Sequence, residues 1–267
     1  MARFHKMHGL GNDFVVIDAR VAPVAMSPAR ACAIGDRHTG VGFDQLILLE
    51  PSDTADAAMR IWNADGGEAQ ACGNAYRAAA VLIGRAVLET QGGKVTIAPS
   101  DTGATAELQP PTFEWQDIPL AYGMDTAPIP IGWDTLSEPT AVNVGNPHVV
   151  FFVEDAQAID LAALGPQIEH DPLFPERINV NVAAVQEDGR VALRTWERGA
   201  GLTRACGTGA CATAVAAIRS KRVSSPVEVV MAGGTLSIAW APGEAIRMTG
   251  PATFVFSGEI DWDMFPL

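Results

Sequence analysis

Short apolar runs, separated by glycine, proline and aspartate, make up most of this chain. Runs of about four to eight residues bounded by such turn-forming residues are typical of β-strands. We therefore predict strands at residues 13–18, 43–50, 57–63, 94–98 and 105–108, and then at 141–144, 148–154, 179–185, 191–197, 227–231, 235–240, 245–249 and 253–257. Their spacing favours antiparallel or mixed sheets.

Four other segments carry the signals of a helix. Ser27 followed by Pro28 is a typical helix start, because serine caps the first turn and proline is favoured at the first helical position. Residues 160–169 are the expected counterpart in the second half of the chain. Residues 73–84 and 207–218 are rich in small and apolar side chains, and the second segment contains no charged residue. A helix that is apolar on every side is buried, so we expect each of two sheets to curl around one of these helices.

The chain repeats itself at a spacing of 134 residues, which superimposes Ala71–Asn74 on Ala205–Thr208. The same spacing, without gaps, aligns Gly11-Asn12 with Gly145-Asn146, Val15-Val16 with Val149-Val150, Arg60 and Trp62 with Arg194 and Trp196, Gly67 with Gly201, Ala80-Val81 with Ala214-Val215, and Gln45 with Asn179. Coincidence in an Ala-, Gly- and Val-rich chain is the alternative, but the rare residues Cys and Trp also match. We predict two similar halves that face each other across a pseudo-two-fold axis. They are an N-terminal lobe, 1–120, carrying Cys72, and a C-terminal lobe, 121–267, carrying Cys206, with a Pro-rich crossover near 109–133.

Composition narrows the class of protein. The 267 residues are 48% apolar and 18% charged, which supports a sizeable core and argues against a disordered chain. The net charge of −13 repels phosphate backbones, so we expect no nucleic-acid partner. No apolar run approaches the roughly 18 residues of a membrane helix, and the start lacks a signal peptide's apolar stretch, so we expect a cytoplasmic protein without a membrane partner.

The cysteine and lysine content limits the cofactor chemistry. Four cysteines are too few for a disulfide scaffold, and none is spaced as in a zinc finger, so we expect reduced thiols and no metal. The only lysines are Lys6, Lys94 and Lys221, and none lies at an obvious site for a Schiff-base cofactor.

Cys72 and Cys206 each lie directly before one of the small-residue helices, and each is followed by glycine. The first N–H groups of a helix have no partner within it, so a helix start attracts anions such as a carboxylate. The same position lowers the pKa of a thiol. A lone cysteine is more often a small buried apolar residue, and we interpret Cys32 and Cys211 in that way. Two cysteines at equivalent places in a repeated chain favour a functional pair.

Two opposed thiols are compatible with three kinds of chemistry. Disulfide exchange usually uses a Cys-x-x-Cys pair, and a metal site needs three or four ligands. Inversion of a stereocentre instead requires a base and an acid on opposite faces of one carbon. A pseudo-two-fold enzyme with one thiol in each half supplies that arrangement, and its two helix starts stabilise the charge that develops when an α-proton leaves.

Seven segments carry distinctive motifs: Lys6–Phe14, Arg37–Gln45, Asn63–Asn74, Gly145–His148, Arg177–Asn181, Trp196–Gly201 and Ala205–Cys211. Together they make the chain resemble the diaminopimelate epimerase family over nearly its whole length. Two departures are visible: Gly67 stands where the family usually has serine, and Ala75 where it often has glycine. Neither touches a thiol, so we expect a tuned affinity rather than an altered reaction.

The resemblance implies cofactor-independent epimerisation of LL-2,6-diaminopimelate to the meso form, on the route to lysine and peptidoglycan. It implies an α+β fold of two mixed, mainly antiparallel barrel-like sheets, each around a central helix, and a homodimer. It also implies that Cys72 and Cys206 are the acid–base pair. The residues that it implies for the carboxylate cradle are Gly73, Asn74, Gly207 and Thr208. Those that it implies for the rest of the substrate pocket are Asn12, Gln45, Asn63, Asn146, Asn179, Glu197 and Arg198.

The repeat breaks inside its matched blocks, where the mismatched pairs are Phe14 with His148, Asn63 with Glu197 and Ala64 with Arg198. Glu197 can pair with the ammonium at the far end of diaminopimelate, and Arg198 can bind the carboxylate there. His148 and Glu197 can also set the two thiol pKa values apart, a role that the resemblance supports. Plainer alternatives are a structural histidine, a solvated Glu197–Arg198 pair, and asparagines (Asn12 and Asn146) that cap turns.

Other functions remain open at this point. Proline racemases and hydroxyproline epimerases share the two-cysteine logic, but they bind a small ring and need no pair of charges for a distal end. The Glu197–Arg198 sequence therefore favours diaminopimelate. From other classes, a thiol redox switch and a non-catalytic amino-acid-binding protein are the alternatives.

Overall fold

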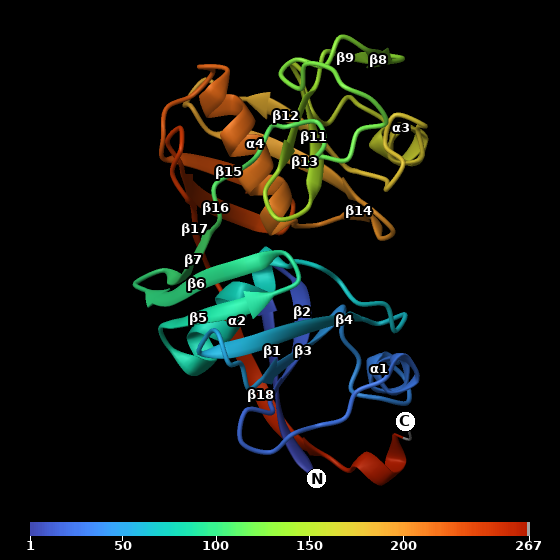
Figure 1. Cartoon of the computed structure of the whole chain (residues 1–267), viewed down its shortest axis with the longest axis vertical. Helices are drawn as coiled ribbons and strands as arrows, with labels where there is room; N and C mark the ends of the chain where they lie inside the picture. Colours follow the sequence, from blue (N-terminus) through green and yellow to red (C-terminus); the bar gives the residue numbers. More distant parts are fainter. Residues whose placement is uncertain (266–267) are drawn as a thin grey trace. The chain divides into compact units, whose positions relative to one another are not determined.

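The computed structural model describes residues 1–265, whose contacts form two compact units (Figure 1). Unit 1 comprises Met1–Glu107 and the C-terminal segment from Thr249, and unit 2 comprises Leu108–Met248. Both boundaries differ from those of the predicted lobes, 1–120 and 121–267. Residues after 107 group with unit 2, in which Thr112 and Asn143 exchange two backbone hydrogen bonds of 3.0 Å. The C-terminal segment groups with unit 1 because its strand pairs there with the first strand of the chain.

The sheet of unit 1 has the strand order β7-β6-β5-β4-β3-β2-β1-β18. Its elements are β1 (Ala2–Gly9), β2 (Asn12–Asp18), α1 (Pro28–Gly35), β3 (Gln45–Glu50), β4 (Ala57–Asn63), α2 (Gly73–Ile83), β5 (Ala86–Thr90), β6 (Gly93–Ser100), β7 (Gly103–Leu108), β18 (Thr253–Ile260) and a 3-10 turn, Trp262–Met264. The β2–β3 and β4–β5 pairs are parallel, and the β1–β18, β1–β2, β3–β4, β5–β6 and β6–β7 pairs are antiparallel. The sheet is therefore mixed and mainly antiparallel.

The two helices of unit 1 lie on opposite faces of this sheet. Helix α1 starts at the predicted cap, where the Ser27 hydroxyl accepts a hydrogen bond from the Arg30 N–H at 3.2 Å. Beneath α1, Leu46 and Leu48 of β3 join an apolar cluster. Their neighbours Ile47 and Leu49 are equally buried but point to the other face, because side chains alternate along a strand. Because β3 is covered on both faces, its residues are apolar without interruption rather than alternating with polar ones.

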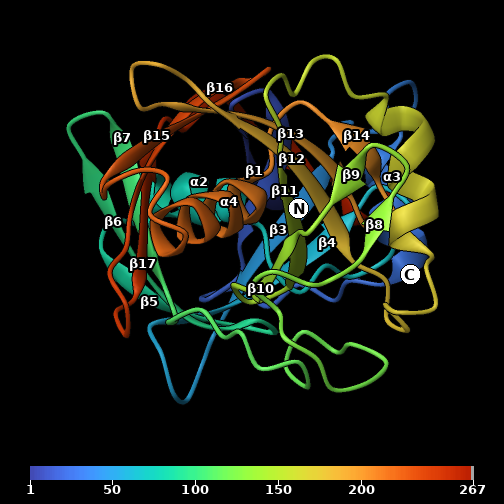
Figure 2. The same cartoon turned by 90° about the horizontal axis from the view of Figure 1, so that it is seen from above.

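Unit 2 repeats this arrangement, with the strand order β10-β11-β12-β13-β15-β16-β17 and β14 paired to β13. Its elements are β8 (Gly132–Trp133), β9 (Leu136–Ser137), β10 (Thr140–Asn143), β11 (Pro147–Phe152), α3 (Leu161–Glu169), β12 (Asn179–Val185), β13 (Val191–Glu197), β14 (Gly201–Thr203), α4 (Gly207–Arg219), β15 (Val227–Met231), β16 (Gly234–Ala239) and β17 (Ile246–Gly250). Helix α4 packs against β10 at one end of this order and against β16 near the other. The sheet therefore curls around the helix, and Figure 2 shows strands on several sides of α4.

The register of the strands follows the sequence repeat. In unit 1, β2 and β3 pair Phe14 with Gln45, and in unit 2, β11 and β12 pair His148 with Asn179, 134 residues further on. The β3–β4 and β12–β13 hairpins show the same correspondence in five pairs, from Leu46 with Trp62 to Glu50 with Ala58 in unit 1. The spacing read from the sequence is therefore the spacing of two equivalent structural units.

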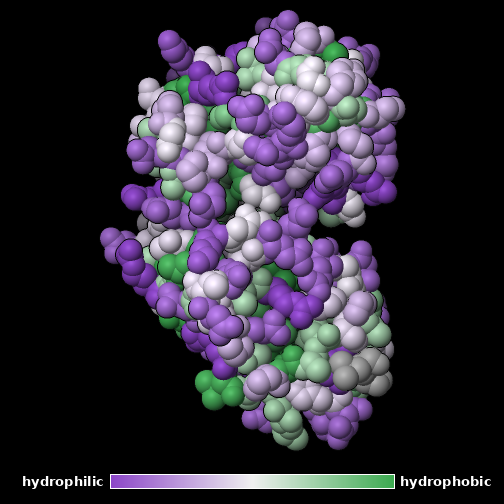
Figure 3. Space-filling view, in the orientation of Figure 1, coloured by the Kyte–Doolittle hydropathy of each residue, from purple (hydrophilic) through white to green (hydrophobic). Residues whose placement is uncertain are grey.

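Polar residues cover most of the face seen in Figure 3. No helix within residues 1–265 is long and apolar enough to cross a membrane.

Candidate functional site

Three strand ends and one helix start meet at one end of the sheet in unit 1. Strand β2 begins at Asn12, β3 begins at Gln45 and β4 ends at Asn63. Because β3 is parallel to β2 and antiparallel to β4, these three carboxamides lie at the same end. The Gln45 side-chain amide donates a hydrogen bond to the side-chain oxygen of Asn63 at 3.1 Å.

A tight turn brings Asn12 to the first cysteine. Leu10 and Gly11 form the two-residue turn between β1 and β2, both with positive φ (58° and 87°), a conformation that glycine adopts at no steric cost. The side-chain oxygen of Asn12 then accepts hydrogen bonds from the Cys72 thiol (3.7 Å) and the Asn74 amide (3.3 Å). The turn therefore joins the start of β2 to the start of α2.

Cys72 is the N-cap of α2, with an extended backbone (φ −147°) and helical residues from Gly73 onward. The guanidinium of Arg77 is fully buried under this first turn, where it donates to the Gly73 carbonyl (3.1 Å) and to the Asn74 side chain (2.7 Å). A buried cation next to the N-terminus of a helix strengthens the attraction for an anion at this helix start.

Asp44 holds Asn12 from the other side, and the sequence reasoning did not single it out. Its carboxylate accepts from the Asn12 amide at 3.2 Å and pairs with Arg37 at 2.8 Å. The neighbouring Asp13 pairs with Arg37 and Lys6. Burial acts to raise the pKa of Asp13, but the hydrogen bonds from Arg37 and Lys6 outweigh it and hold that pKa at about 2. The signal available in the sequence was the position of Asp44 inside the family-like segment 37–45.

Unit 2 has the same arrangement of strand ends and helix start, but several of the side chains there are of a different type. Asn146 directly precedes β11, β12 begins at Asn179, and β13 ends at Glu197. The Asn179 side chain donates to the Pro147 carbonyl (2.8 Å) and accepts from the Arg198 backbone N–H (2.9 Å). The two loops that carry Asn146 and Arg198 are thereby fixed to one another.

Cys206 is the N-cap of α4 and is almost fully buried. Its sulfur accepts a hydrogen bond from the Gly209 N–H at 3.3 Å and lies 3.6 Å from the Thr208 hydroxyl. The Glu197 carboxyl also hydrogen-bonds to this thiol. Burial, and then the charge of Glu197, raise the pKa of the Cys206 thiol well above its ordinary value, against the lowering effect of Thr208 and Gly209.

Glu197 is itself partly buried. Burial raises the pKa of its carboxyl, opposed by hydrogen bonds from Cys206 and from the Thr203 hydroxyl, which lies at 2.6 Å. Thr203, on β14, is a second contact that the sequence reasoning did not include. Arg198, next along the chain, turns its guanidinium to the Glu176 carbonyl at 2.9 Å.

His148 lies on β11 and is completely buried. Its Nε2 is 2.9 Å from the Asn146 side-chain oxygen, and its Nδ1 is 3.1 Å from the Asn181 side-chain nitrogen. Burial, and then the charge of Arg198, lower the pKa of His148 to about 3, so the ring is neutral at neutral pH. Of the two residues expected to act on thiol pKa values, Glu197 contacts the Cys206 thiol, whereas His148 contacts two asparagines, Asn146 and Asn181.

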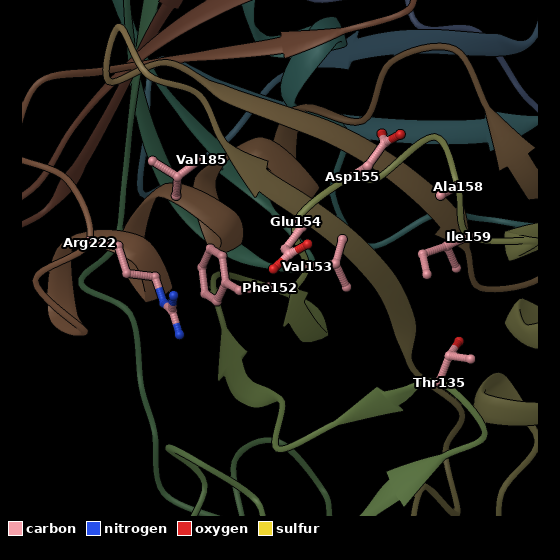
Figure 4. A pocket seen from close by; sticks show the side chains of 9 residues that line it. All are labelled: Thr135, Phe152, Val153, Glu154, Asp155, Ala158, Ile159, Val185 and Arg222. Atoms are coloured by element: carbon pink, nitrogen blue, oxygen red, sulfur yellow. The ribbon is translucent and has the colours of Figure 1, made fainter.

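The predicted residues thus form two clusters, one in each unit. The unit 1 cluster contains Asn12, Gln45, Asn63, Cys72, Gly73 and Asn74, and the unit 2 cluster contains Asn146, His148, Asn179, Glu197, Arg198, Cys206, Gly207 and Thr208. A cavity of about 680 Å³ in unit 2 is separate from both clusters (Figure 4). It lies beside Phe152 and Ile159, with Arg222 over the Phe152 ring at 4.7 Å, and none of the predicted residues lines it.

A family model described as diaminopimelate epimerase matches residues 4–113 and 140–255. The chain is similar to the diaminopimelate epimerase of Sphingopyxis alaskensis, with 64% identity over 98% of each chain. It is also similar to that of Rhizorhabdus wittichii, with 61% identity over 98% of this chain and 97% of the relative.

A solved structure, a probable proline racemase from Agrobacterium radiobacter K84, superimposes with a TM-score of 0.69 over 99% of this chain and 94% of that one. Its sequence identity is 16%, so this likeness concerns the fold alone. The family model and the two relatives extend the likeness to the sequence itself and cover nearly every residue. The chain therefore belongs to the diaminopimelate epimerase family.

Proposed function

We propose that this protein interconverts LL- and meso-2,6-diaminopimelate by moving a proton at one α-carbon, without a cofactor. The observation that carries the proposal is the pair of cysteine N-caps. Cys72 and Cys206 start helices α2 and α4 at equivalent places in two units with the same strand register. Membership of the diaminopimelate epimerase family supports the choice of substrate.

The two thiols have complementary tasks. One cysteine, as a thiolate, takes the α-proton and becomes a thiol, and the electron pair of the C–H bond stays on the substrate. The other cysteine, as a thiol, gives its proton to the opposite face of the same carbon and becomes a thiolate. In the reverse reaction, which starts from the mirror-related centre, the two cysteines exchange roles. Two groups of the same kind therefore suit both directions.

The helix starts would stabilise the reacting carboxylate. We assign this cradle to Gly73 and Asn74 in unit 1 and to Gly207 and Thr208 in unit 2, because N–H groups at a helix start have no partner within the helix. Negative charge spreads onto the carboxylate as the α-proton leaves. Fixed dipoles that point at this charge lower the barrier more than they stabilise the bound ground state.

The surroundings of Cys206 support a proposal about which thiol holds a proton at rest. The burial of Cys206 and the neighbouring Glu197 favour the protonated thiol. We therefore propose that Cys206 rests as the acid and that Glu197 sets its pKa. His148 also belongs to unit 2, and its effect passes through Asn146, whose side-chain oxygen accepts a hydrogen bond from the imidazole ring.

The remaining polar residues would recognise the rest of the substrate. We assign this pocket to Asn12, Gln45, Asn63, Asn146, Asn179, Glu197 and Arg198. Diaminopimelate has a second amino-acid end, and the guanidinium of Arg198 is suited to the carboxylate there. Its counterpart in unit 1 is Ala64, so only one orientation of the substrate gains this contact.

An assay of the purified protein tests this function. We expect conversion of LL-diaminopimelate to the meso form without added pyridoxal phosphate or metal, and no racemisation of proline. Cys72→Ala and Cys206→Ala each abolish net inversion, because each removes one of the two proton carriers. The control Cys32→Ala, which removes a free thiol outside both clusters, retains activity. Turnover of proline but not of diaminopimelate would reverse the choice of substrate, and full activity of either Cys72→Ala or Cys206→Ala would refute the pairing.

We also propose that the protein forms a homodimer through β18. This strand is the last in the sheet order of unit 1, so its outer edge pairs with no other strand of residues 1–265. Phe254, Val255 and Phe256 on it are 49%, 53% and 48% exposed. An exposed apolar edge strand is a template for pairing with another strand, and a second copy of β18 offers the same apolar surface.

A cytoplasmic location suits this chemistry. All four cysteines are thiols rather than members of disulfides, and the proposed mechanism needs two of them as thiol and thiolate. Thiols stay reduced in the cytoplasm, whereas an oxidising compartment would consume them.

A further inference from the structure

One buried layer differs in character between the two units, although the repeat aligns it position by position. In unit 1 the layer consists of Phe14, Ile47, Ile61 and Ala75, all essentially inaccessible to solvent. At the spacing of 134 residues the layer in unit 2 consists of His148, Asn181, Thr195 and Gly209. Ile47 pairs with Ile61 across β3 and β4 just as Asn181 pairs with Thr195 across β12 and β13.

The polar layer forms one continuous hydrogen-bonded chain. The Thr195 hydroxyl donates to the Asn181 side-chain oxygen at 3.0 Å. The Asn181 side-chain nitrogen donates to the Val149 carbonyl at 3.1 Å and to His148 Nδ1 at 3.1 Å. His148 Nε2 then reaches the side-chain oxygen of Asn146 at 2.9 Å.

The donor and acceptor in each of these hydrogen bonds follow from one group that can only accept, the Val149 carbonyl. The carbonyl of Val149 can only accept, so the end of the Asn181 amide that faces it is the nitrogen. That same nitrogen faces His148 Nδ1, which must then be the unprotonated ring nitrogen. A neutral imidazole carries its one proton on the other nitrogen, so Nε2–H donates to Asn146.

Asn146 is thereby turned in one direction. Its oxygen is held by His148, and its side-chain NH₂ hydrogen-bonds to no group within residues 1–265. The equivalent Asn12 is held the other way, with its NH₂ on Asp44 and its oxygen on Cys72 and Asn74. The two units therefore present opposite ends of the same amide.

Helix α4 is fitted closely against this chain of hydrogen bonds. A Cβ at Gly209 would lie 2.7 Å from the Asn181 side-chain oxygen, which is too close, and 3.0 Å from the Thr195 hydroxyl, which is a tight contact. In unit 1 the corresponding residue is Ala75, and the residues equivalent to Asn181 and Thr195 are the buried Ile47 and Ile61. The first turn behind Cys206 therefore has room for the polar layer only because Gly209 lacks a side chain.

We propose that Asn181 and Thr195 are positioning residues, which fix the Nε2–H form of His148 and so turn the NH₂ of Asn146 toward the substrate as a hydrogen-bond donor. Buried polar groups are costly unless every one is paired, and an apolar layer fills the same place in unit 1. In unit 2 the polar groups are retained, and each is hydrogen-bonded to the next in a chain that ends at Asn146. The orientation of Asn146 does not depend on the proposed function. Only the identity of the group that Asn146 binds, the substrate, rests on it.

Nitrogen NMR of the histidine rings tests the first half of the proposal without any substrate. The full-length chain has five histidines, and His148→Gln identifies the signals of His148 by their disappearance. We expect the neutral ring with the proton on Nε2 across pH 5 to 8. A ring protonated on Nδ1, or one that takes up a proton near pH 6.5, would overturn the proposal. This result stands whether or not the protein epimerises diaminopimelate.

Asn181→Asp reverses the polarity of the chain with almost no change in size. An ionised aspartate accepts but does not donate, so it draws a proton onto His148 Nδ1. The ring signals should change accordingly, and KM for LL-diaminopimelate should rise at least tenfold, with a smaller change in kcat. Unchanged ring signals would contradict the role of Asn181. Changed signals with an unchanged KM would show that Asn146 does not depend on this ring.

Thr195→Val is the milder variant, and Thr213→Val is its matched control. Both remove a buried hydroxyl from unit 2, but the Thr213 hydroxyl has no hydrogen-bond partner within residues 1–265. We expect Thr195→Val to raise KM about fivefold, as the loss of one hydrogen bond of about 1 kcal/mol implies, and Thr213→Val to leave KM unchanged. Equal effects of the two variants would attribute the loss to packing and overturn the role of Thr195. An inactive wild-type protein with the expected ring signals would refute the proposed function alone.

Discussion

At the scale of single residues, the sequence singled out candidate side chains for the chemistry but did not predict their contacts. The positions of Cys72 and Cys206 as helix caps follow from the Cys-Gly starts of two small-residue helices. The contact between Glu197 and the Cys206 thiol joins the end of β13 to the start of α4, and no spacing rule predicts it. Asp44, Asn181 and Thr195 were missed because each acts through another polar residue.

The acidity of Cys206 provides a prediction at this scale. Glu197→Gln removes the negative charge that helps to raise the pKa of the thiol, so this pKa should fall. The rate of alkylation of Cys206 by iodoacetamide, followed by peptide mass spectrometry, should therefore rise at lower pH than in the wild type.

Thr208→Val is the opposing control, because the Thr208 hydroxyl acts to lower the pKa of the Cys206 thiol. Its alkylation profile should move to higher pH. Profiles that move in the same direction in Glu197→Gln and Thr208→Val would contradict this account of the thiol.

His148 makes a second prediction, about stability. Its pKa is about 3 in the folded protein and about 6.5 in an unfolded chain, so between these values the unfolded state binds more protons. The free energy of unfolding should therefore fall as the pH drops from 6.5 toward 3, with a contribution from this residue of up to about 1.4 kcal/mol per pH unit. Urea denaturation of the wild type and of His148→Gln at several pH values measures this contribution. A variant with the same pH slope as the wild type would disprove it.

At the scale of elements, apolar pattern and capping signals located the four α-helices within residues 1–265 and most strands of the two sheets. Strand β1 was missed because Arg3, His5, Lys6 and His8 interrupt its apolar pattern, and it forms a strand by pairing with β2 on one side and β18 on the other. The short strand β5 was missed as well. Its pairing with β4 is a long-range contact, which a local pattern does not report.

The starts of α2 and α4 give a prediction for this scale. Gly209→Ala places a methyl group 2.7 Å from the Asn181 side-chain oxygen, so the first turn of α4 or the polar layer must shift. We expect kcat/KM to fall at least tenfold and the melting temperature to drop. The comparison variant Ala75→Gly, at the equivalent place in α2, should cost only the roughly 1 kcal/mol of stability typical of glycine in a helix. A Gly209→Ala enzyme with wild-type kinetics would mean that the close fit is unimportant.

At the scale of the whole molecule, the sequence repeat predicted the duplicated architecture and even the register of its strands. It did not predict that the last strand returns to the first unit, because β18 lies after the end of the second repeat and has no partner in the alignment. The pairing of β18 with β1 joins residues that are remote in the sequence. The repeat spacing carries no information about such a long-range pair.

The exposed edge of β18 makes the prediction that belongs to this scale. Sedimentation equilibrium of the wild type should give the mass of a dimer, about twice 28.1 kDa. Val255→Lys places a charge on the edge strand and should shift the equilibrium to the monomer. The control Val21→Lys substitutes a valine of unit 1 that is 95% exposed and lies outside β18, and it should remain dimeric. A monomeric wild type, or a dimer unaffected by Val255→Lys, would rule out this interface.

The central claim is that two different groups exchange a proton with opposite faces of one α-carbon. The most direct test follows LL-diaminopimelate in heavy water and locates deuterium early in the reaction by NMR and mass spectrometry. Because the thiol that delivers the proton has equilibrated with solvent, the meso product should carry one deuterium at the inverted carbon, while unreacted substrate keeps its original hydrogen. Product that retains the original hydrogen, or deuterium that enters substrate and product equally from the outset, would contradict a reaction carried out by Cys72 and Cys206 as separate base and acid.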